Sequence, residues 1–201
     1  MQDNAANPAP GPWGGPNGED RAEIETALAL LAVGPGSVFV DAGCGGGRFA
    51  LAACALAGPS GRIAALDSDG KYLGALRREA EARRFRNVVI LRADMTRGVP
   101  VAANAADACL AAGVLHMPMV WRALPDVFRE FARILRPGGR LVVSLRLLRD
   151  APAGPPSPDV RARRRLEDAA AACGLARLAE RPFGFQRFLD RKSTRLNSSH
   201  T

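Results

Sequence analysis

The segment VFVDAGCGGGRF, residues 38–49, decides the fold of this chain. Its three leading apolar residues are typical of a short strand buried on both faces, as in a parallel sheet. Four glycines between Gly43 and Gly47 then permit a loop with positive φ and almost no side-chain bulk. Apolar residues at helical spacing resume at Phe49. A strand, a glycine loop and a helix N-terminus together let a ligand approach free backbone N–H groups.

The spacing of the glycines separates the possible ligand classes. A dinucleotide fingerprint, G-x-G-x-x-G, requires glycine at position 48 when counted from Gly43, and the chain has Arg48 there. A glycine-rich turn without any ligand is an alternative, which four glycines directly after a buried strand disfavour. The pattern that is present is D-x-G-x-G-x-G, beginning at Asp41.

Strand and helix patterns alternate along the rest of the chain. Strands are expected over 38–40, 62–66, 88–91, 108–111 and 141–145. Helices are expected from Asp20 as N-cap to Leu31, and over 48–57, 71–82, 121–135 and 159–173. Two short runs near 175–180 and 185–189 suggest a hairpin. The alternation predicts an α/β, doubly wound, parallel sheet with right-handed crossovers.

Composition divides the chain into three parts. Residues 1–19, rich in Pro, Gly and Asn, are expected to form a flexible N-terminal arm. Residues 20–190 have the length of one α/β domain. Residues 191–201 lack an apolar period, differ in composition from the rest and resemble translated adapter sequence. We expect this non-native-looking tail to be disordered and exclude it from the fold.

The net charge of +8 invites a nucleic-acid interpretation, but arginine supplies nearly all of it. The dense run at 161–165 has no interleaved aromatic residues and is interpreted as a solvated helix face. Nucleic-acid binding is therefore disfavoured.

The four cysteines show no C-x-x-C spacing, which argues against a zinc site or a disulfide framework. Since no run is long enough to span a membrane and no basic secretory segment begins the chain, a cytoplasmic location is expected.

Asp67 follows the second expected strand. It lies twenty residues beyond Gly47, the distance at which a ribose-binding carboxylate belongs in a nucleotide-binding βαβ unit. Its alternative role is the N-cap of the next helix, a position that Ser68 or Asp69 can fill instead. We therefore favour ribose binding for Asp67.

The D-x-G-x-G-x-G pattern, Asp67 and the turn Arg136-Pro137-Gly138-Gly139 together resemble the class I S-adenosylmethionine-dependent methyltransferases. The resemblance covers about residues 20–190 and is closest to the small-molecule branch that includes the ubiquinone and menaquinone biosynthesis methyltransferases. It implies a Rossmann-like, seven-stranded sheet, mostly parallel, with a C-terminal antiparallel hairpin. It also implies S-adenosyl-L-methionine as cofactor and a small-molecule methyl acceptor.

The same resemblance implies which residues bind the cofactor. The first motif supplies Asp41, Ala42, Gly43, Cys44, Gly45 and Gly47. Asp67 and Ser68 would bind the ribose, Asp94 the adenine amino group and Met95 the face of the ring, while Ala112 and Gly113 would contact the methionine part. An ordinary loop aspartate is the alternative for Asp94. Asp107 matches an acidic residue found just before the fourth strand, which we interpret as structural.

His116 is the candidate catalytic residue. A sulfonium carries an already activated methyl group, so transfer is an in-line displacement, and a general base matters only if the acceptor arrives protonated. Histidine is the side-chain type that ordinarily changes charge near neutral pH. His116 is expected at the cleft mouth, although it could also be a lid residue that only packs. Met117, Met119 and Trp121 could wall an apolar acceptor pocket or pack as a hydrophobic lid.

Two other functions compete with this one. A nicotinamide-dependent oxidoreductase is disfavoured by Arg48 and by the terminal hairpin. A noncatalytic S-adenosylmethionine-binding or regulatory protein stays open, because methyl transfer has no obligatory catalytic side chain. The sequence leaves the oligomeric state and the acceptor atom undetermined.

Overall fold

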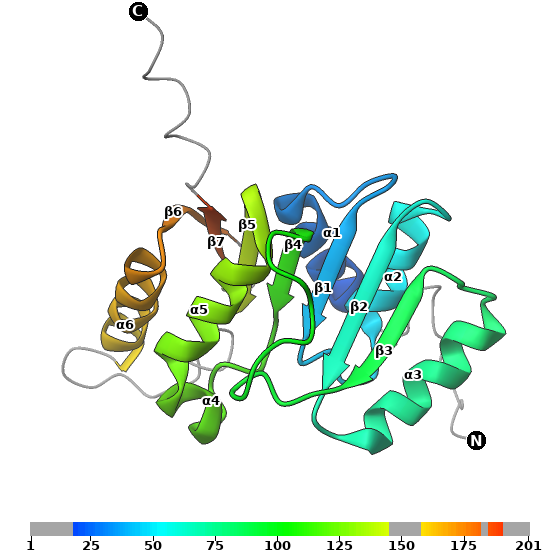
Figure 1. Ribbon diagram of the computed structural model, residues 1–201, viewed down its shortest axis with the longest axis horizontal. Helices are drawn as coiled ribbons and strands as arrows, with labels where there is room; N and C mark the ends of the chain where they lie inside the picture. Colours follow the sequence, from blue (N-terminus) through cyan, green and yellow to red (C-terminus); the bar gives the residue numbers. More distant parts are fainter. Residues whose placement is uncertain (1–17, 145–157, 182–184, 191–201) are drawn as a thin grey trace, which may run out of the picture.

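A computed structural model describes residues 18–144, 158–181 and 185–190 of the chain (Figure 1). One sheet runs through the molecule, with strands in the order β3-β2-β1-β4-β5-β7-β6. Its strands are β1 (Val38–Ala42), β2 (Arg62–Asp67), β3 (Val88–Arg92), β4 (Ala106–Ala111), β5 (Leu135–Ser144), β6 (Leu175–Arg181) and β7 (Phe185–Asp190). The first five pair in parallel, whereas β7 is antiparallel to both β5 and β6. The predicted α/β class with a mostly parallel sheet is confirmed.

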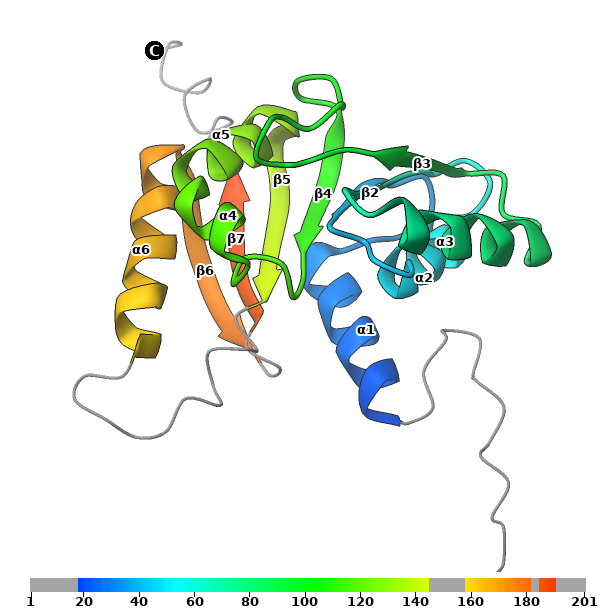
Figure 2. The same ribbon diagram turned by 90° about the horizontal axis from the view of Figure 1, so that it is seen from below.

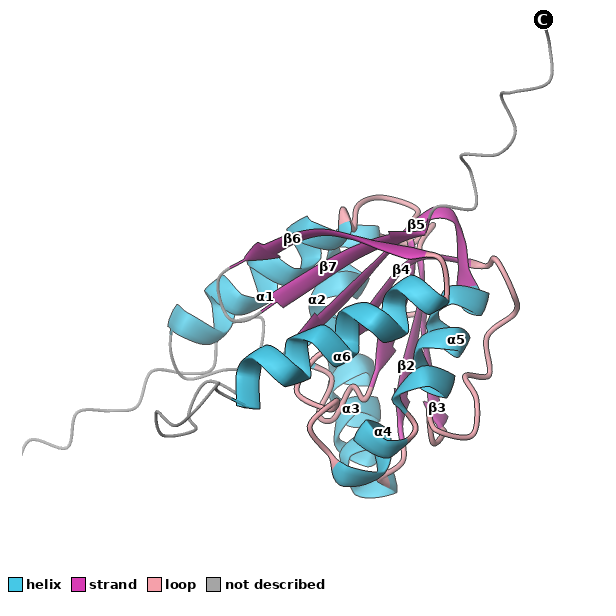
Figure 3. Ribbon diagram, turned by 90° about the vertical axis from the view of Figure 1, so that its left-hand side faces the viewer, coloured by secondary structure: helices cyan, strands magenta, loops and turns pink. Residues whose placement is uncertain are grey.

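Helices cover both faces of the sheet (Figure 2). They are α1 (Gly18–Leu31), α2 (Arg48–Ala57), α3 (Gly70–Ala82), α4 (Pro118–Arg122), α5 (Leu124–Ile134) and α6 (Pro158–Ala172). Figure 3 shows α5 and α6 neighbouring each other on one face, with α4 near them. The structure describes no helix with the length and apolar character of a membrane span.

Successive side chains of β1 pack into two separate hydrophobic cores, one on each face of the sheet. Phe39 packs into the cluster formed with α1, α2 and α3, whereas Val40 packs into the cluster formed with α4, α5 and α6. Both side chains are fully buried, because successive residues of a strand point to opposite faces of a sheet that is covered on both sides. The central position of β1 places the glycine loop that follows it in the middle of one sheet edge.

Several predicted boundaries are wrong. The helix predicted over 121–135 is two helices, because Pro125 cannot continue a helix from the preceding turn and instead stands in the first turn of α5. The strand predicted over 141–145 begins at Leu135, and the Arg136–Gly139 turn lies within β5, where its register against β4 shifts. The first helix begins at Gly18, so Asp20 is not its N-cap.

Asp107 lies inside β4 rather than before it. Its Oδ2 accepts a hydrogen bond of 2.7 Å from the Val38 N–H, and its Oδ1 pairs with the Arg136 guanidinium. This carboxylate joins the start of β1 to the turn in β5, in keeping with the structural role predicted for it. The flexible arm predicted over 1–19 falls mostly outside the described residues, and the tail over 191–201 falls entirely outside them.

Candidate active site

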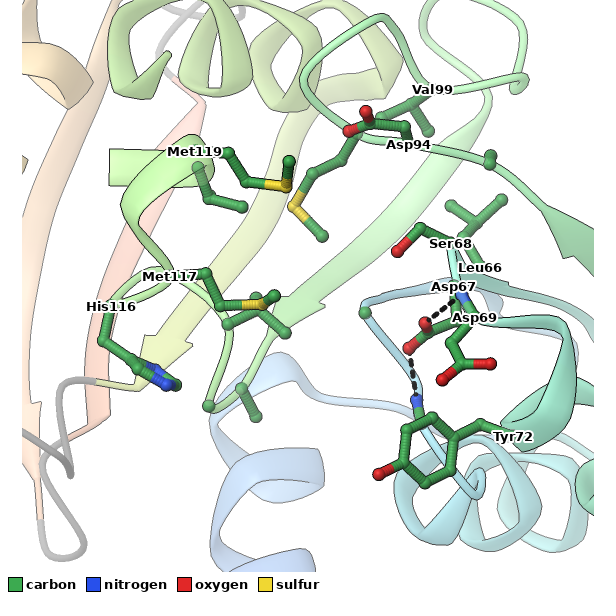
Figure 4. A pocket seen from close by; sticks show the side chains of 18 of the residues that line it. Leu66, Asp67, Ser68, Asp69, Tyr72, Asp94, Val99, His116, Met117 and Met119 are labelled. Atoms are coloured by element: carbon green, nitrogen blue, oxygen red, sulfur yellow. Dashed lines mark hydrogen bonds between the residues drawn. The ribbon is translucent and has the colours of Figure 1, made fainter. Parts of the chain in front are cut away.

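A cavity of about 600 Å³ opens at the carboxyl ends of the parallel strands (Figure 4). Ligands of open α/β sheets bind at this edge, beside the strand where the order reverses, and that strand here is β1. Nine of the predicted site residues line the cavity: Gly43, Gly45, Asp67, Ser68, Asp94, Met95, Ala112, Gly113 and His116. The other four, Asp41, Ala42, Cys44 and Gly47, do not line it and are buried.

The glycine loop needs glycine for two separate reasons. Gly43, Gly45 and Gly47 have φ of 82°, 51° and 84°, in the left-handed region that side chains disfavour. A Cβ on Gly43 would also stand 2.3 Å from Cγ1 of Val114. The N–H groups of Gly43 and Cys44 both donate to the carbonyl of Leu66, at 2.8 and 2.9 Å, and thereby hold the loop against β2. The result is a backbone cradle that side chains would fill.

Asp67 projects from the end of β2 toward this cradle. Its Oδ2 accepts a 2.8 Å hydrogen bond from the Gly45 N–H, and its Oδ1 accepts a 2.9 Å hydrogen bond from the Asp69 N–H. Each carboxylate oxygen has a second lone pair that can accept from a ligand hydroxyl. The alternative N-cap role belongs instead to Asp69, whose side chain accepts from the Lys71 N–H at the start of α3. Asp67 therefore lines the cavity with acceptor capacity left on both oxygens.

Asp94 lies in the loop after β3. Its Oδ1 accepts hydrogen bonds from the N–H and the hydroxyl of Thr96, at 2.9 and 2.7 Å. These two hydrogen bonds lower the pKa of the Asp94 carboxyl below its ordinary value. The neighbouring Met95 packs on the core, with its Cε 3.3 Å from the point where a Gly43 Cβ would stand. Asp94 is thus an ionised acceptor at the far end of the cavity from His116.

Asp41 is buried at the end of β1, beneath the loop. Its carboxyl has a pKa raised from 3.8 to about 7, mainly by burial and to a smaller extent by the charge of Asp67. A hydrogen bond from the Ala50 N–H and the charge of Arg48 act in the opposite direction. Arg48 in turn pairs with the buried Glu23 of α1, at 2.7 Å. Oδ2 of Asp41 is buried without a hydrogen-bond partner, so this carboxyl is a costly group beside the cofactor cradle.

The buried Asp41 carboxyl is expected to make the protein less stable as pH rises. The unfolded chain loses this proton near pH 4 and the folded chain near pH 7, so the folded state binds more protons in between. From about pH 6 to about pH 8, the free energy of unfolding should fall by about 1 kcal/mol. Asp41→Asn should abolish that part of the slope, measured by urea unfolding of both proteins at each pH. Parallel slopes would contradict the protonated state of Asp41.

The opposite end of the cavity is mainly apolar. Figure 4 shows His116, Met117 and Met119 on one side of the cavity and Asp67, Asp69 and Tyr72 on the other. Met117 is 40% exposed and Met119 is 57% exposed, unusually high values for large apolar side chains. The two methionines therefore form a wall of the cavity, which is one of the two roles that the sequence allows them.

Trp121 does not belong to this wall. The guanidinium carbon of Arg165 lies 4.9 Å from the centre of its ring, and Nη2 of Arg165 donates a 2.9 Å hydrogen bond to the Trp121 carbonyl. These contacts join the end of α4 to α6 and favour a packing role for Trp121. They also correct the interpretation of 161–165 as a purely solvated face, since Arg165 has a specific partner.

Sequence reasoning missed several residues of the cavity. Tyr72, in the first turn of α3, lines it and is 54% exposed, although the sequence placed it with the apolar face of that helix. Its position five residues after Asp67, at the start of a helix that follows the ribose-binding strand, is a signal that could have found it. Val99, Val114 and Val120 also line the cavity, and they come from loops and a short helix that the strand pattern does not place.

None of the cysteines offers a ready nucleophile. Cys44, Cys54 and Cys109 are buried, and burial raises the pKa of each thiol well above its ordinary value. These thiols therefore stay protonated at neutral pH. Within the described part of the chain, no three His, Cys, Asp or Glu residues are grouped so that they could hold a metal ion.

A Rossmann-like sheet with a glycine cradle after β1 and a carboxylate after β2 is the arrangement expected of the class I S-adenosylmethionine-dependent methyltransferases, and other nucleotide-binding α/β proteins share its outline. Residues 39–139, half of the chain, match the family described as the methyltransferase domain. The chain belongs to this family, and it is an S-adenosylmethionine-dependent methyltransferase. No curated protein matches it in sequence.

Solved structures share the fold. A methyltransferase from Aquifex aeolicus superposes with a TM-score of 0.67 at 17% identity, covering 84% of this chain and 89% of that one. A geranyl diphosphate methyltransferase, solved with geranyl diphosphate and sinefungin, gives 0.66 at 21% identity, over 85% of this chain and 78% of that one. The geranyl diphosphate C-methyltransferase of Streptomyces coelicolor gives 0.63 at 24% identity, over 79% and 59%.

Proposed function

We propose that this enzyme transfers a methyl group from S-adenosyl-L-methionine to a small-molecule acceptor. The observation that carries the proposal is that one cavity joins the glycine cradle and Asp67 to the apolar wall of Met117 and Met119. The cradle would hold the methionine part, with Ala112 and Gly113 beside it. Asp67 would hold the ribose hydroxyls, and Asp94 the adenine amino group. Two structural neighbours, a geranyl diphosphate methyltransferase and a coclaurine N-methyltransferase, were solved with small molecules, geranyl diphosphate and N-methylheliamine.

The residues present fit the cofactor. Asp67 has free acceptor capacity on both oxygens, and the loop has no Cβ where a ligand would approach. When bound, S-adenosylmethionine supplies an activated methyl group for in-line displacement, so no covalent enzyme intermediate is required. The protein therefore contributes alignment of the two reactants and exclusion of water, with the buried valines Val114 and Val120 behind the exposed methionines.

A calorimetric titration tests the cofactor assignment. Purified protein cleared of carried-over ligand is titrated with S-adenosylmethionine, S-adenosylhomocysteine and NAD. We expect micromolar affinity for S-adenosylmethionine and S-adenosylhomocysteine and no heat of binding with NAD. Binding of NAD alone would identify an oxidoreductase, while cofactor binding without turnover on any acceptor would identify the noncatalytic alternative.

His116 is proposed as the group that takes the acceptor's proton. Its exposed imidazole lines the acceptor end of the cavity. His116→Ala should leave the affinity for S-adenosylhomocysteine unchanged and slow methylation of a hydroxyl acceptor about 10²-fold or more. His116→Gln, which keeps hydrogen bonding but cannot act as a base at neutral pH, serves as the matched control. Full activity of both variants would show that His116 does not take the acceptor's proton and only packs as a lid residue.

The β6–β7 hairpin is proposed to complete a seven-stranded sheet in solution. In support, β7 pairs with β5 from Arg140↔Leu189 to Ser144↔Phe185. Leu141, Val142 and Val143 of β5 are fully buried, as expected of a strand paired on both sides. The amides of β5 should then be among the slowest to exchange with deuterium. Exchange as fast as that of the edge strand β3 would contradict the hairpin's place.

Other features predicted from the sequence stay predictions. These are the ubiquinone-like branch of the family, the cytoplasmic location, the lack of nucleic-acid binding and the domain limits at 20 and 190.

A further inference from the structure

The described residues that line the cavity bring negative charge to it. Three carboxylates line it, those of Asp67, Asp69 and Asp94. Among the described residues that line it, none is an arginine or a lysine. His116 is the one histidine among these described lining residues.

Three described arginines close to the glycine loop and the strand ends have partners of their own. Arg48 pairs with Glu23 beneath the loop, at 2.7 Å. Arg92 donates to the Ser68 carbonyl through Nε, at 3.1 Å, and Nε of Arg97 lies 3.7 Å from Oδ2 of Asp94. Each of these contacts belongs to the glycine loop or to the strand ends after β2 and β3. None of them brings a positive charge to the wall formed by Met117 and Met119.

Among the described residues, this wall therefore offers an anionic acceptor no counter-charge in exchange for the hydration that it would lose there. An unpaired ion that leaves water is penalised, whereas an apolar body gains from contact with methionine and valine. The Streptomyces coelicolor neighbour was solved with Mg²⁺ and a thiolodiphosphate ligand. The described residues of this chain offer no group of three metal ligands for such a pairing.

We propose that the acceptor is an uncharged molecule with an apolar body, and that its nucleophilic atom is a hydroxyl or a neutral amine. The inference rests on the proposed methyl transfer and narrows its substrate to this class. Flexible, polarizable methionines suit an apolar surface of variable shape, and His116 is the polar group available to the hydroxyl or amine.

Matched probes with one apolar skeleton test this inference. The full-length protein is first titrated with S-adenosylhomocysteine, and failure of that step counts against the proposed function itself. The loaded protein is then titrated with geraniol and, separately, with geranyl diphosphate in the presence of Mg²⁺. The alcohol is expected to bind roughly tenfold more tightly than the diphosphate, or better. Equal or tighter binding of the diphosphate would overturn the inference, as would failure of geraniol to bind at millimolar concentration.

A positive charge added to the wall should weaken the preference for the alcohol over the diphosphate. Met119→Arg places a cation at an exposed position of the wall, where the fold need not rearrange. The variant should gain roughly tenfold in affinity for geranyl diphosphate relative to the wild type. Leu56→Arg is the matched control, because Leu56 is also exposed but lies on α2 outside the cavity, so it adds the same net charge. An equal gain in both variants would show that the overall charge decides, and would refute a neutral-acceptor site at this wall.

Discussion

Gly47→Ala is expected to lower the free energy of unfolding by about 2–4 kcal/mol, because two penalties act at one position. The backbone of Gly47 has φ of 84°, which an L-residue adopts only with strain. An added Cβ would stand 2.2 Å from Cδ1 of Leu76, a fully buried side chain of α3. Since Leu76 has no free space to enter, α3 or the loop would have to move. Urea unfolding monitored by circular dichroism measures the loss.

Gly46→Ala is the control for this prediction. Gly46 is exposed, its φ is not positive, and an added Cβ would meet no atom within 4 Å. The substitution should change stability by no more than about 0.5 kcal/mol. Equal effects at the two neighbouring positions would show that glycine composition alone, and not packing of the loop on α3, decides stability here.

Asp67→Ala is expected to weaken the binding of S-adenosylmethionine by about 10- to 100-fold. The change removes charge-assisted hydrogen bonds to the ribose, worth about 1–3 kcal/mol together. It also removes the 2.8 Å hydrogen bond that Asp67 accepts from the Gly45 N–H, so the cradle loses a support. Asp67→Asn, which keeps one acceptor oxygen without the charge, should fall between the alanine variant and the wild type. Calorimetric titration with S-adenosylhomocysteine measures the affinity of each protein.

Asp107→Ala is the control that distinguishes a loss of ligand contacts from a loss of fold stability. Asp107 also accepts a hydrogen bond from a backbone N–H of a strand, that of Val38, but it lies outside the cavity. Its removal should lower stability and leave cofactor affinity nearly unchanged. Unchanged affinity in Asp67→Ala would refute the ribose assignment, and equal losses in both variants would assign the effect to the fold.

Local patterns made the cofactor side of the site predictable. The glycine loop and Asp67 each follow a short apolar strand, and the carboxyl ends of adjacent parallel strands meet at one edge. The sequence pattern is therefore enough to bring these residues together. The split between α4 and α5 had a local signal too, in Pro125, which the apolar period of the helix outweighed.

The remaining features depend on contacts between distant segments. The raised pKa of Asp41 follows from burial among residues of other strands and helices, which the sequence around position 41 does not show. The contact of Arg165 with Trp121 joins residues 44 positions apart. The Val114 side chain lies close to Gly43 only because β4 pairs with β1. Each of these features depends on how distant segments pack together, and local sequence patterns do not reveal that packing.

The two sides of the cavity are formed by different kinds of chain segment. The cofactor side is assembled from the ends of β1, β2 and β3, so a change there disturbs the centre of the sheet. The acceptor side comes largely from one continuous piece, residues 114–120, which precedes α5 and carries the exposed methionines. Substitutions within residues 114–120 can therefore reshape the acceptor end without altering the residues proposed to hold the methyl donor.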